Sequence, residues 1–202
     1  MRFSIAIVLL VAGYTWIVEP VAGRAWASAI AVAVIGLGVW HAARRGDWGW
    51  STPAFVPALA ASALLTGLAA AGLVLVSRAV AGEHVEPLSA SVSSPELGWL
   101  LVWGGAQQWL LQTTFLREAE LVWSGRRAPL VAAALFGALH LPNPVLTAVT
   151  FGAGLAWCTI YSRWPNVLPL ALSHAVGTVL LHALPGDVLT GGLRVGSAYW
   201  RS

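Results

Sequence analysis

Uncharged polar side chains interrupt three apolar segments of this chain. They are Gln107, Gln108 and Gln112 in the run Gln-Gln-Trp-Leu-Leu-Gln, His140 at the end of Phe-Gly-Ala-Leu-His, and His174 with Thr178 in His-Ala-Val-Gly-Thr. A polar group in hydrocarbon is costly unless it has a partner, so side chains at similar depth are expected to face one another. Imidazoles can take up or donate a proton, and carboxamides can position water or a peptide. These residues are therefore the candidate active centre.

The spacing of the glutamines favours a common surface. Gln108 and Gln112 are four residues apart and share a face of a regular helix, while Gln107 is offset by about 100°. The alternative is that such residues only join membrane helices, through hydrogen bonds worth about 0.6–2 kcal/mol each. Three glutamines within six residues, followed by histidines on two later segments, favour a site.

The composition excludes an ordinary soluble protein. The chain has 202 residues, of which 58% are hydrophobic and 9% are charged, and its mean hydropathy is +0.76. Soluble domains carry roughly 25% charged residues. Apolar stretches of about twenty residues recur along the chain, so we predict an all-α fold, a polytopic helical membrane bundle forming one integral membrane domain over residues 1–202. The expected partners are the lipid bilayer and a membrane-anchored protein or peptide, and no nucleic acid.

About seven transmembrane or re-entrant helices are predicted. They cover residues 3–20, 25–43, 54–80, 97–116, 128–141, 144–162 and 166–184. The fifth is short and ends at Leu141-Pro142-Asn143-Pro144, so it need not cross the membrane fully. Most tryptophans fall near predicted helix ends, as in an interfacial belt. Trp103 and Trp109 do not, and we expect them at depth, filling the core or walling a pocket.

The arginines predict the orientation. Placing the N-terminus and the 44–53, 117–127 and 163–165 loops on one face gathers seven of the eleven arginines there. This asymmetry favours a cytoplasmic N-terminus, and we expect the bacterial inner membrane as the location. Glu19-Pro20 interrupts the region where a signal peptidase would cut, so the first helix is expected to be retained.

Few residues outside the cluster are candidates for chemistry. The single Cys158 lies in an apolar segment, which excludes an intramolecular disulfide. No cofactor is expected, and Zn²⁺ on His140 and His174 is a weak alternative because no third strong ligand is visible. Glu118 and Glu120 follow the fourth predicted helix, and we expect both to be solvated and paired with arginines there, namely Arg117, Arg126 or Arg127.

The order of these motifs resembles the CPBP family of intramembrane proteases, which comprises CAAX prenyl endopeptidases and bacteriocin-processing (Abi) proteins. The family's motifs are Glu-Glu-x-x-x-Arg, Phe-x-x-x-His, and His-x-x-x-Asn or a similar residue. This chain has Gln107-Gln108-x-x-x-Gln112, Phe136-x-x-x-His140 and His174-x-x-x-Thr178 at the corresponding places. The resemblance covers a core of about residues 97–184.

The resemblance implies an endopeptidase that processes membrane-anchored proteins, including C-terminally anchored or CAAX-like ones. It places His140, His174, Gln107, Gln108 and Gln112 in catalysis, and Phe136 and Thr178 in substrate binding. In the family the first glutamate is thought to activate water, helped by the histidines, which also bind the oxyanion. A carboxamide cannot accept that proton, and general-base catalysis typically contributes about 10²–10⁴-fold.

Three functions therefore remain open from the sequence. In an active endopeptidase, His140 or His174 activates the water. A catalytically degenerate relative keeps the cavity and binds membrane peptides or lipids. A transporter or channel uses the glutamines and histidines to line a polar path. The missing carboxylate is the feature that separates the first function from the second.

Overall fold

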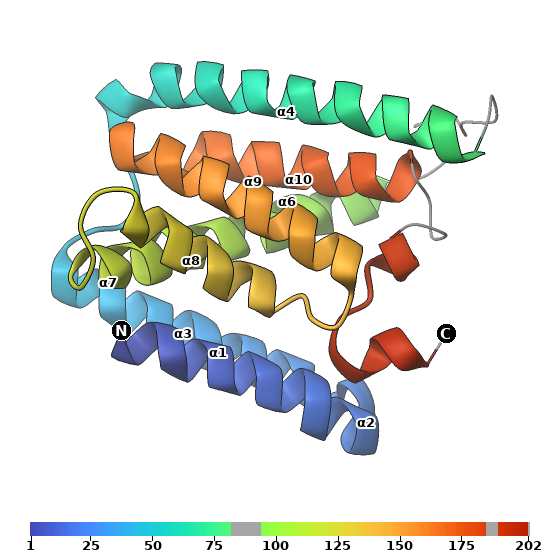
Figure 1. The fold of residues 1–202 in the computed structure, drawn as a ribbon. Helices are drawn as coiled ribbons and strands as arrows, with labels where there is room; N and C mark the ends of the chain where they lie inside the picture. The colour runs from blue at the N-terminus through green and yellow to red at the C-terminus, as the bar shows by residue number, and fades with distance from the viewer. Residues whose placement is uncertain (82–93, 185–189, 202) are drawn as a thin grey trace. The chain divides into compact units, whose positions relative to one another are not determined.

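The computed structural model describes residues 1–81, 94–184 and 190–201, and in these ranges every regular element is a helix (Figure 1). Helical structure covers each of the seven predicted segments. The elements are α1 (Arg2–Gly13), η1 (Tyr14–Val18), α2 (Glu19–Ala22), η2 (Gly23–Trp26), α3 (Ala27–Arg45), α4 (Thr52–Ala81), α6 (Ser94–Leu110), η3 (Leu111–Leu116), α7 (Arg117–Glu120), α8 (Arg127–Ala138), α9 (Pro144–Arg163), α10 (Val167–Ala183), η4 (Gly191–Leu193) and η5 (Gly196–Trp200). The predicted all-α class is confirmed.

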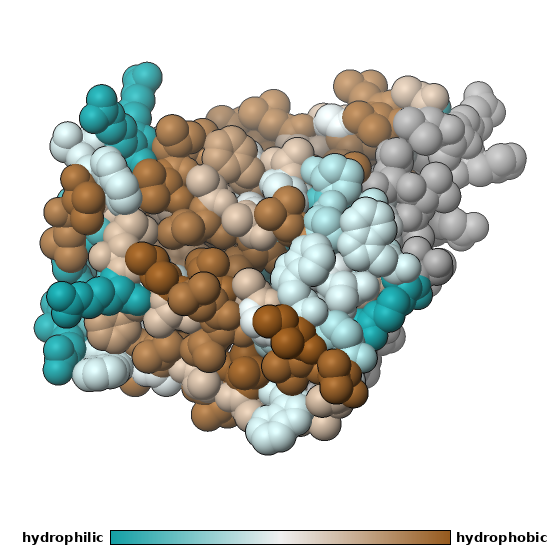
Figure 2. Space-filling model, turned by 60° about the horizontal axis from the view of Figure 1, so that its bottom comes forward, coloured by the Kyte–Doolittle hydropathy of each residue, from teal (hydrophilic) through white to brown (hydrophobic). Residues whose placement is uncertain are grey.

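Several helices suit a membrane by length and composition. Within the described ranges four are long and apolar enough to cross one, over Arg2–Ala22, Ala27–Arg45, Thr52–Ala79 and Pro144–Arg163, while α8 and α10 are shorter apolar helices. Their outer faces carry large hydrophobic side chains such as Leu9, Val32 and Leu64, each about two-thirds exposed or more. Hydrophobic residues predominate on the face shown in Figure 2. Exposed hydrophobic side chains are unfavourable in water but are accommodated by the hydrocarbon of a bilayer, so the chain is an integral membrane protein.

The chain forms two compact units. The first unit comprises residues 1–49, 110–159 and 194–202, and the second comprises 50–109 and 160–193. The boundary falls inside the helix that carries the three glutamines, between Trp109 and Leu110. Gln107, Gln108 and His174 belong to the second unit, whereas Gln112 and His140 belong to the first.

The first unit is built around the π-helical turn η3. This turn contacts α1, α3 and α8, and all six of its residues are buried. Its polar members include Gln112, which is fully buried, as is Cys158 of α9 in the same unit. A π-helical turn bonds residue i to i+5, so the four-residue spacing that predicted a shared face for Gln108 and Gln112 does not carry through it.

Glu118 in α7 is buried, and the prediction that it is solvated and paired with arginine was wrong. Its Oε2 accepts hydrogen bonds from the Ser4 N–H and the Ser4 hydroxyl, both at 2.7 Å, and its Oε1 accepts one from the Phe3 N–H at 3.2 Å. The first N–H groups of a helix have no partner within the helix and carry its positive dipole end. Glu118 therefore caps α1 from a distant part of the chain.

Glu120 behaves as predicted, because its Oε2 accepts from Arg117 Nη1 at 2.8 Å. The same guanidinium donates from Nε to Asp47 at 2.7 Å, which links α7 to the loop after α3. Both carboxylates of this network are partly exposed. The network therefore contributes little to stability beside the buried Glu118.

The C-terminal segment fastens the turn that follows α8. The Gly196 N–H donates to the Leu141 carbonyl at 2.8 Å, and Asn143 Nδ2 donates to the Arg194 carbonyl at 3.1 Å. Gly196 has a φ of +58°, and a Cβ there would lie 2.6 Å from the Thr15 Cβ, so this position requires glycine. These contacts hold the chain immediately after His140.

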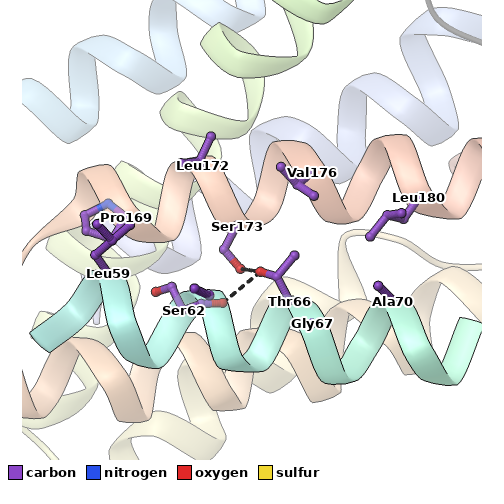
Figure 3. Close-up of a pocket in the computed structure, with 11 residues that line it drawn as sticks. Leu59, Ser62, Thr66, Gly67, Ala70, Pro169, Leu172, Ser173, Val176 and Leu180 are labelled. Atoms are coloured by element: carbon purple, nitrogen blue, oxygen red, sulfur yellow. Dashed lines mark hydrogen bonds between the residues drawn. The ribbon is translucent and has the colours of Figure 1, made fainter. Parts of the chain in front are cut away.

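In the second unit, α4 and α10 pack side by side (Figure 1). A groove of about 390 Å³, lined mostly by apolar side chains, lies between them. Figure 3 shows the residues that line it. The Thr66 hydroxyl donates to the Ser62 carbonyl at 2.8 Å and lies 2.8 Å from Ser173 Oγ. Because Thr66 has only one hydroxyl hydrogen, the Ser173 hydroxyl is the donor between the two helices. This bond places α10, the helix that carries His174, against α4.

Burial raises the pKa of Glu118, but the hydrogen bonds from Ser4 and Phe3 outweigh burial and hold the pKa below its ordinary value. A carboxyl whose pKa falls on folding stabilises the folded state above its unfolded pKa. That contribution is lost as the pH falls through the folded pKa.

Glu118→Gln is expected to lower the free energy of unfolding at pH 7 by about 1–3 kcal/mol, because the α1 N–H groups lose a charged acceptor. The gap to wild type should narrow as the pH falls below about 4.3, where the carboxyl of the unfolded chain takes up its proton. Chemical unfolding in detergent, measured between pH 3 and pH 7, tests this. The matched control is Glu120→Gln, which should cost about 0–1 kcal/mol. Equal losses for the two variants would contradict the capping role.

Candidate functional site

Two of the predicted site residues meet in the second unit. Gln108 of α6 is fully buried, His174 of α10 is 8% exposed, and Gln108 Nε2 lies 3.2 Å from His174 Nδ1. One turn before Gln108 stands Gly104, where a Cβ would lie 3.6 Å from both His174 Cγ and the Ala175 backbone N. A small residue here lets α10 approach α6 closely, as is usual between membrane helices. The structure thus joins the first motif to the third.

The second motif forms a local unit at the end of α8. Phe136 is buried, and His140 Nδ1 donates to the Phe136 carbonyl at 2.8 Å. The two rings meet edge to face, with centroids 5.0 Å apart. Carbonyl groups in the last turn of a helix lack partners within the helix, and His140 satisfies one of them. The Phe-x-x-x-His spacing is the spacing that this bond requires, because residues four apart lie one above the other.

Glycines on α8 and α9 set the position of this motif. A Cβ at Gly137 would lie 3.0 Å from the Phe151 Cβ and 3.3 Å from the Thr147 carbonyl oxygen, both on α9. A Cβ at Gly154 would lie 3.3 Å from the Phe136 ring. The Phe136 side chain therefore occupies space that small residues of α9 leave open.

Gly137→Ala is expected to push α9 away from α8 and to cost about 1–3 kcal/mol, as overpacking usually does. It should also weaken any activity that depends on His140, which lies three residues further on. Gly152→Ala on α9 is the matched control, because a Cβ there meets nothing within 4 Å and alanine favours a helix. Thermal unfolding of both variants in the same detergent tests this. The packing account is wrong if Gly137→Ala is as stable as Gly152→Ala.

The remaining predicted residues differ in their surroundings. Gln107 is partly exposed, whereas Gln112 is fully buried. The Thr178 hydroxyl donates to the His174 carbonyl at 3.0 Å, so it is satisfied within α10. Because Gln112, Phe136 and His140 belong to one unit and the other four to the second, the convergence of all seven residues on one centre stays a prediction.

Two further expectations concerned the tryptophans of α6. Trp103 was expected to fill the core or wall a pocket, but it is 44% exposed and stacks on Trp99, with ring centroids 6.0 Å apart. Core filling was wrong for Trp103 because its side chain lies on the exposed side of α6. Trp109 is partly buried.

The donor set for a metal is sparse. Among the residues that the structure describes, no three His, Cys, Asp or Glu side chains come close enough to hold a metal ion. Gln108 occupies the Nδ1 side of His174, and the Phe136 carbonyl occupies the Nδ1 side of His140. Each imidazole can therefore offer only its Nε2 to a ligand.

Sequence reasoning missed one polar anchor, Ser4. Ser4 stands in the first turn of α1, where the positive end of the helix favours a carboxylate, but the identity of that carboxylate depends on the fold. Cys158, the single cysteine of the chain, is fully buried.

One segment of the chain matches a known protein family. Residues 101–180 match the family model for Rce1-like proteins, described as type II CAAX prenyl endopeptidases. No curated protein and no solved structure matches the chain. The matched residues include all three motifs and lie within the predicted 97–184 core. Over residues 101–180 the chain is therefore similar to the Rce1-like type II CAAX prenyl endopeptidases, a protease family, as its three motifs indicate.

Proposed function

We propose that this protein is an intramembrane endopeptidase that cleaves a membrane-anchored protein or peptide, with C-terminally anchored or CAAX-like chains as the substrate class. The observation that carries the proposal is the buried contact between Gln108 and His174, which joins two of the family's motifs in hydrocarbon. The Rce1-like match over these helices supports the same conclusion. An ionisable side chain that faces the interior of a membrane bundle usually marks a functional site.

In this proposal an imidazole replaces the carboxylate as the general base. A neutral imidazole can take a proton from water, which a carboxamide cannot do. Gln107 and Gln112 position the water and the peptide, while Phe136 and Thr178 bind the substrate. The buried carboxylate of Glu118 does not supply the base in this proposal, because its oxygens accept the N–H groups of α1.

A site without carboxylates also suits its environment. An ionised side chain inside the membrane costs several kcal/mol unless it is paired. Replacing both motif glutamates and the motif arginine by glutamine removes the charges together and keeps the hydrogen-bonding capacity. We place the protein in a bacterial inner membrane with a cytoplasmic N-terminus, as the arginine asymmetry favours.

The test uses the full chain in proteoliposomes with a panel of peptides that carry a C-terminal membrane anchor. His140→Ala and His174→Ala should each lower cleavage by about 10²–10⁴-fold, the usual contribution of proton-transfer catalysis. The matched control is His182→Ala, because His182 lies on α10 but is exposed. Cleavage that survives in both site variants would rule out the proposed site.

The glutamines also favour a second candidate, a degenerate relative that binds membrane peptides without cutting them. Gln107→Glu restores the carboxylate of the family's first motif and separates the two candidates. An active wild-type chain supports the endopeptidase. An inert wild type whose Gln107→Glu variant cleaves supports the binding protein.

A further inference from the structure

We infer that Gln108 fixes the tautomer of His174, so that His174 carries its hydrogen on Nε2, whereas His140 carries its hydrogen on Nδ1. The assignment of tautomers depends only on the geometry of each histidine. The assignment of catalytic roles rests on the proposed function. Gln108 acts through His174 and is thus a positioning residue.

The argument for His174 starts from the atom that faces it. The carboxamide nitrogen of Gln108 can only donate, so His174 Nδ1, 3.2 Å away, must accept. A neutral imidazole carries one N–H hydrogen, which is therefore on Nε2. Both side chains are buried, so bulk water does not compete for Nδ1. An ionised glutamate at this position would accept instead and would draw the hydrogen onto Nδ1.

The argument for His140 leads to the opposite tautomer. Its Nδ1 lies 2.8 Å from the Phe136 carbonyl, which can only accept. The hydrogen is therefore on Nδ1, and Nε2 keeps its lone pair. Of the two histidines, only His140 presents a proton acceptor at Nε2 when Nδ1 keeps its bond.

Within the proposed function, the two tautomers give each histidine a different capacity. His174 offers an N–H donor at Nε2, the kind of group that stabilises a developing oxyanion. His140 offers a lone pair at Nε2, the kind of group that takes up a proton.

The first experiment records ¹⁵N spectra of the histidine-labelled full chain in lipid bilayers, with signals assigned through His140→Gln and His174→Gln. The expected result is a protonated Nε2 with a hydrogen-bonded, unprotonated Nδ1 for His174, and the reverse for His140. In Gln108→Leu the His174 Nδ1 signal should shift to that of a nitrogen without a donor. The control Ser62→Ala removes a buried hydroxyl of α4 in the same unit and should leave both signals unchanged. A protonated His174 Nδ1 in the wild type, or no shift in Gln108→Leu, would overturn the inference.

The second experiment measures cleavage by the same variants. Gln108→Leu should lower kcat by about tenfold to a hundredfold, the usual effect of losing the partner that orients a functional imidazole. KM should change little, because Gln108 does not contact the substrate. A loss confined to KM would overturn the positioning role. If both tautomers are as expected but no anchored peptide is cut, the proposed endopeptidase function is wrong. The inference that Gln108 fixes the tautomer of His174 is then still supported.

Discussion

Hydrocarbon offers no hydrogen bonds, and this constraint bears on the polar groups of the three motifs. Gln108 and His174 form a hydrogen bond with each other. The His140 side chain donates to the Phe136 carbonyl, and the Thr178 hydroxyl donates to the His174 carbonyl. Each bond satisfies a polar group, and each bond to an imidazole also selects its tautomer. In the proposed site, which has no carboxylate, the two tautomers would give chemically identical residues different hydrogen-bonding roles.

The same constraint explains how the buried carboxylate of Glu118 is accommodated. Glu118 is buried, but its oxygens accept three hydrogen bonds from residues 3 and 4 at the positive end of α1. The carboxylate is thereby compensated without an arginine. It also fastens α1 next to the turn η3, which contacts α1, α3 and α8. The one buried carboxylate that α7 contributes is thus structural, and the proposed chemistry rests on neutral groups.

Much of the fold could be predicted from the sequence, because apolar length is a strong signal. The seven helical segments, the short fifth helix and its end before Asn143 followed from hydrophobic runs and prolines. The cost of unpartnered polar groups predicted that polar side chains of these segments face one another, but not that Gln108 in particular bonds His174. The π-helical turn at 111–116 was not, because it depends on packing against three other helices and not on local residue preferences. The partner of Glu118 was missed for a related reason, since residues 114 positions apart meet only in the folded chain.

The central claim is that Gln108 and His174 bond each other inside the membrane protein. A double-mutant cycle measures this most directly, by comparing the unfolding free energies of wild type, Gln108→Leu, His174→Leu and the double variant in bilayer-like detergent. The account predicts a favourable coupling of about 0.6–1.7 kcal/mol, the range found for hydrogen bonds between membrane helices. Single-variant losses that simply add in the double variant would contradict it.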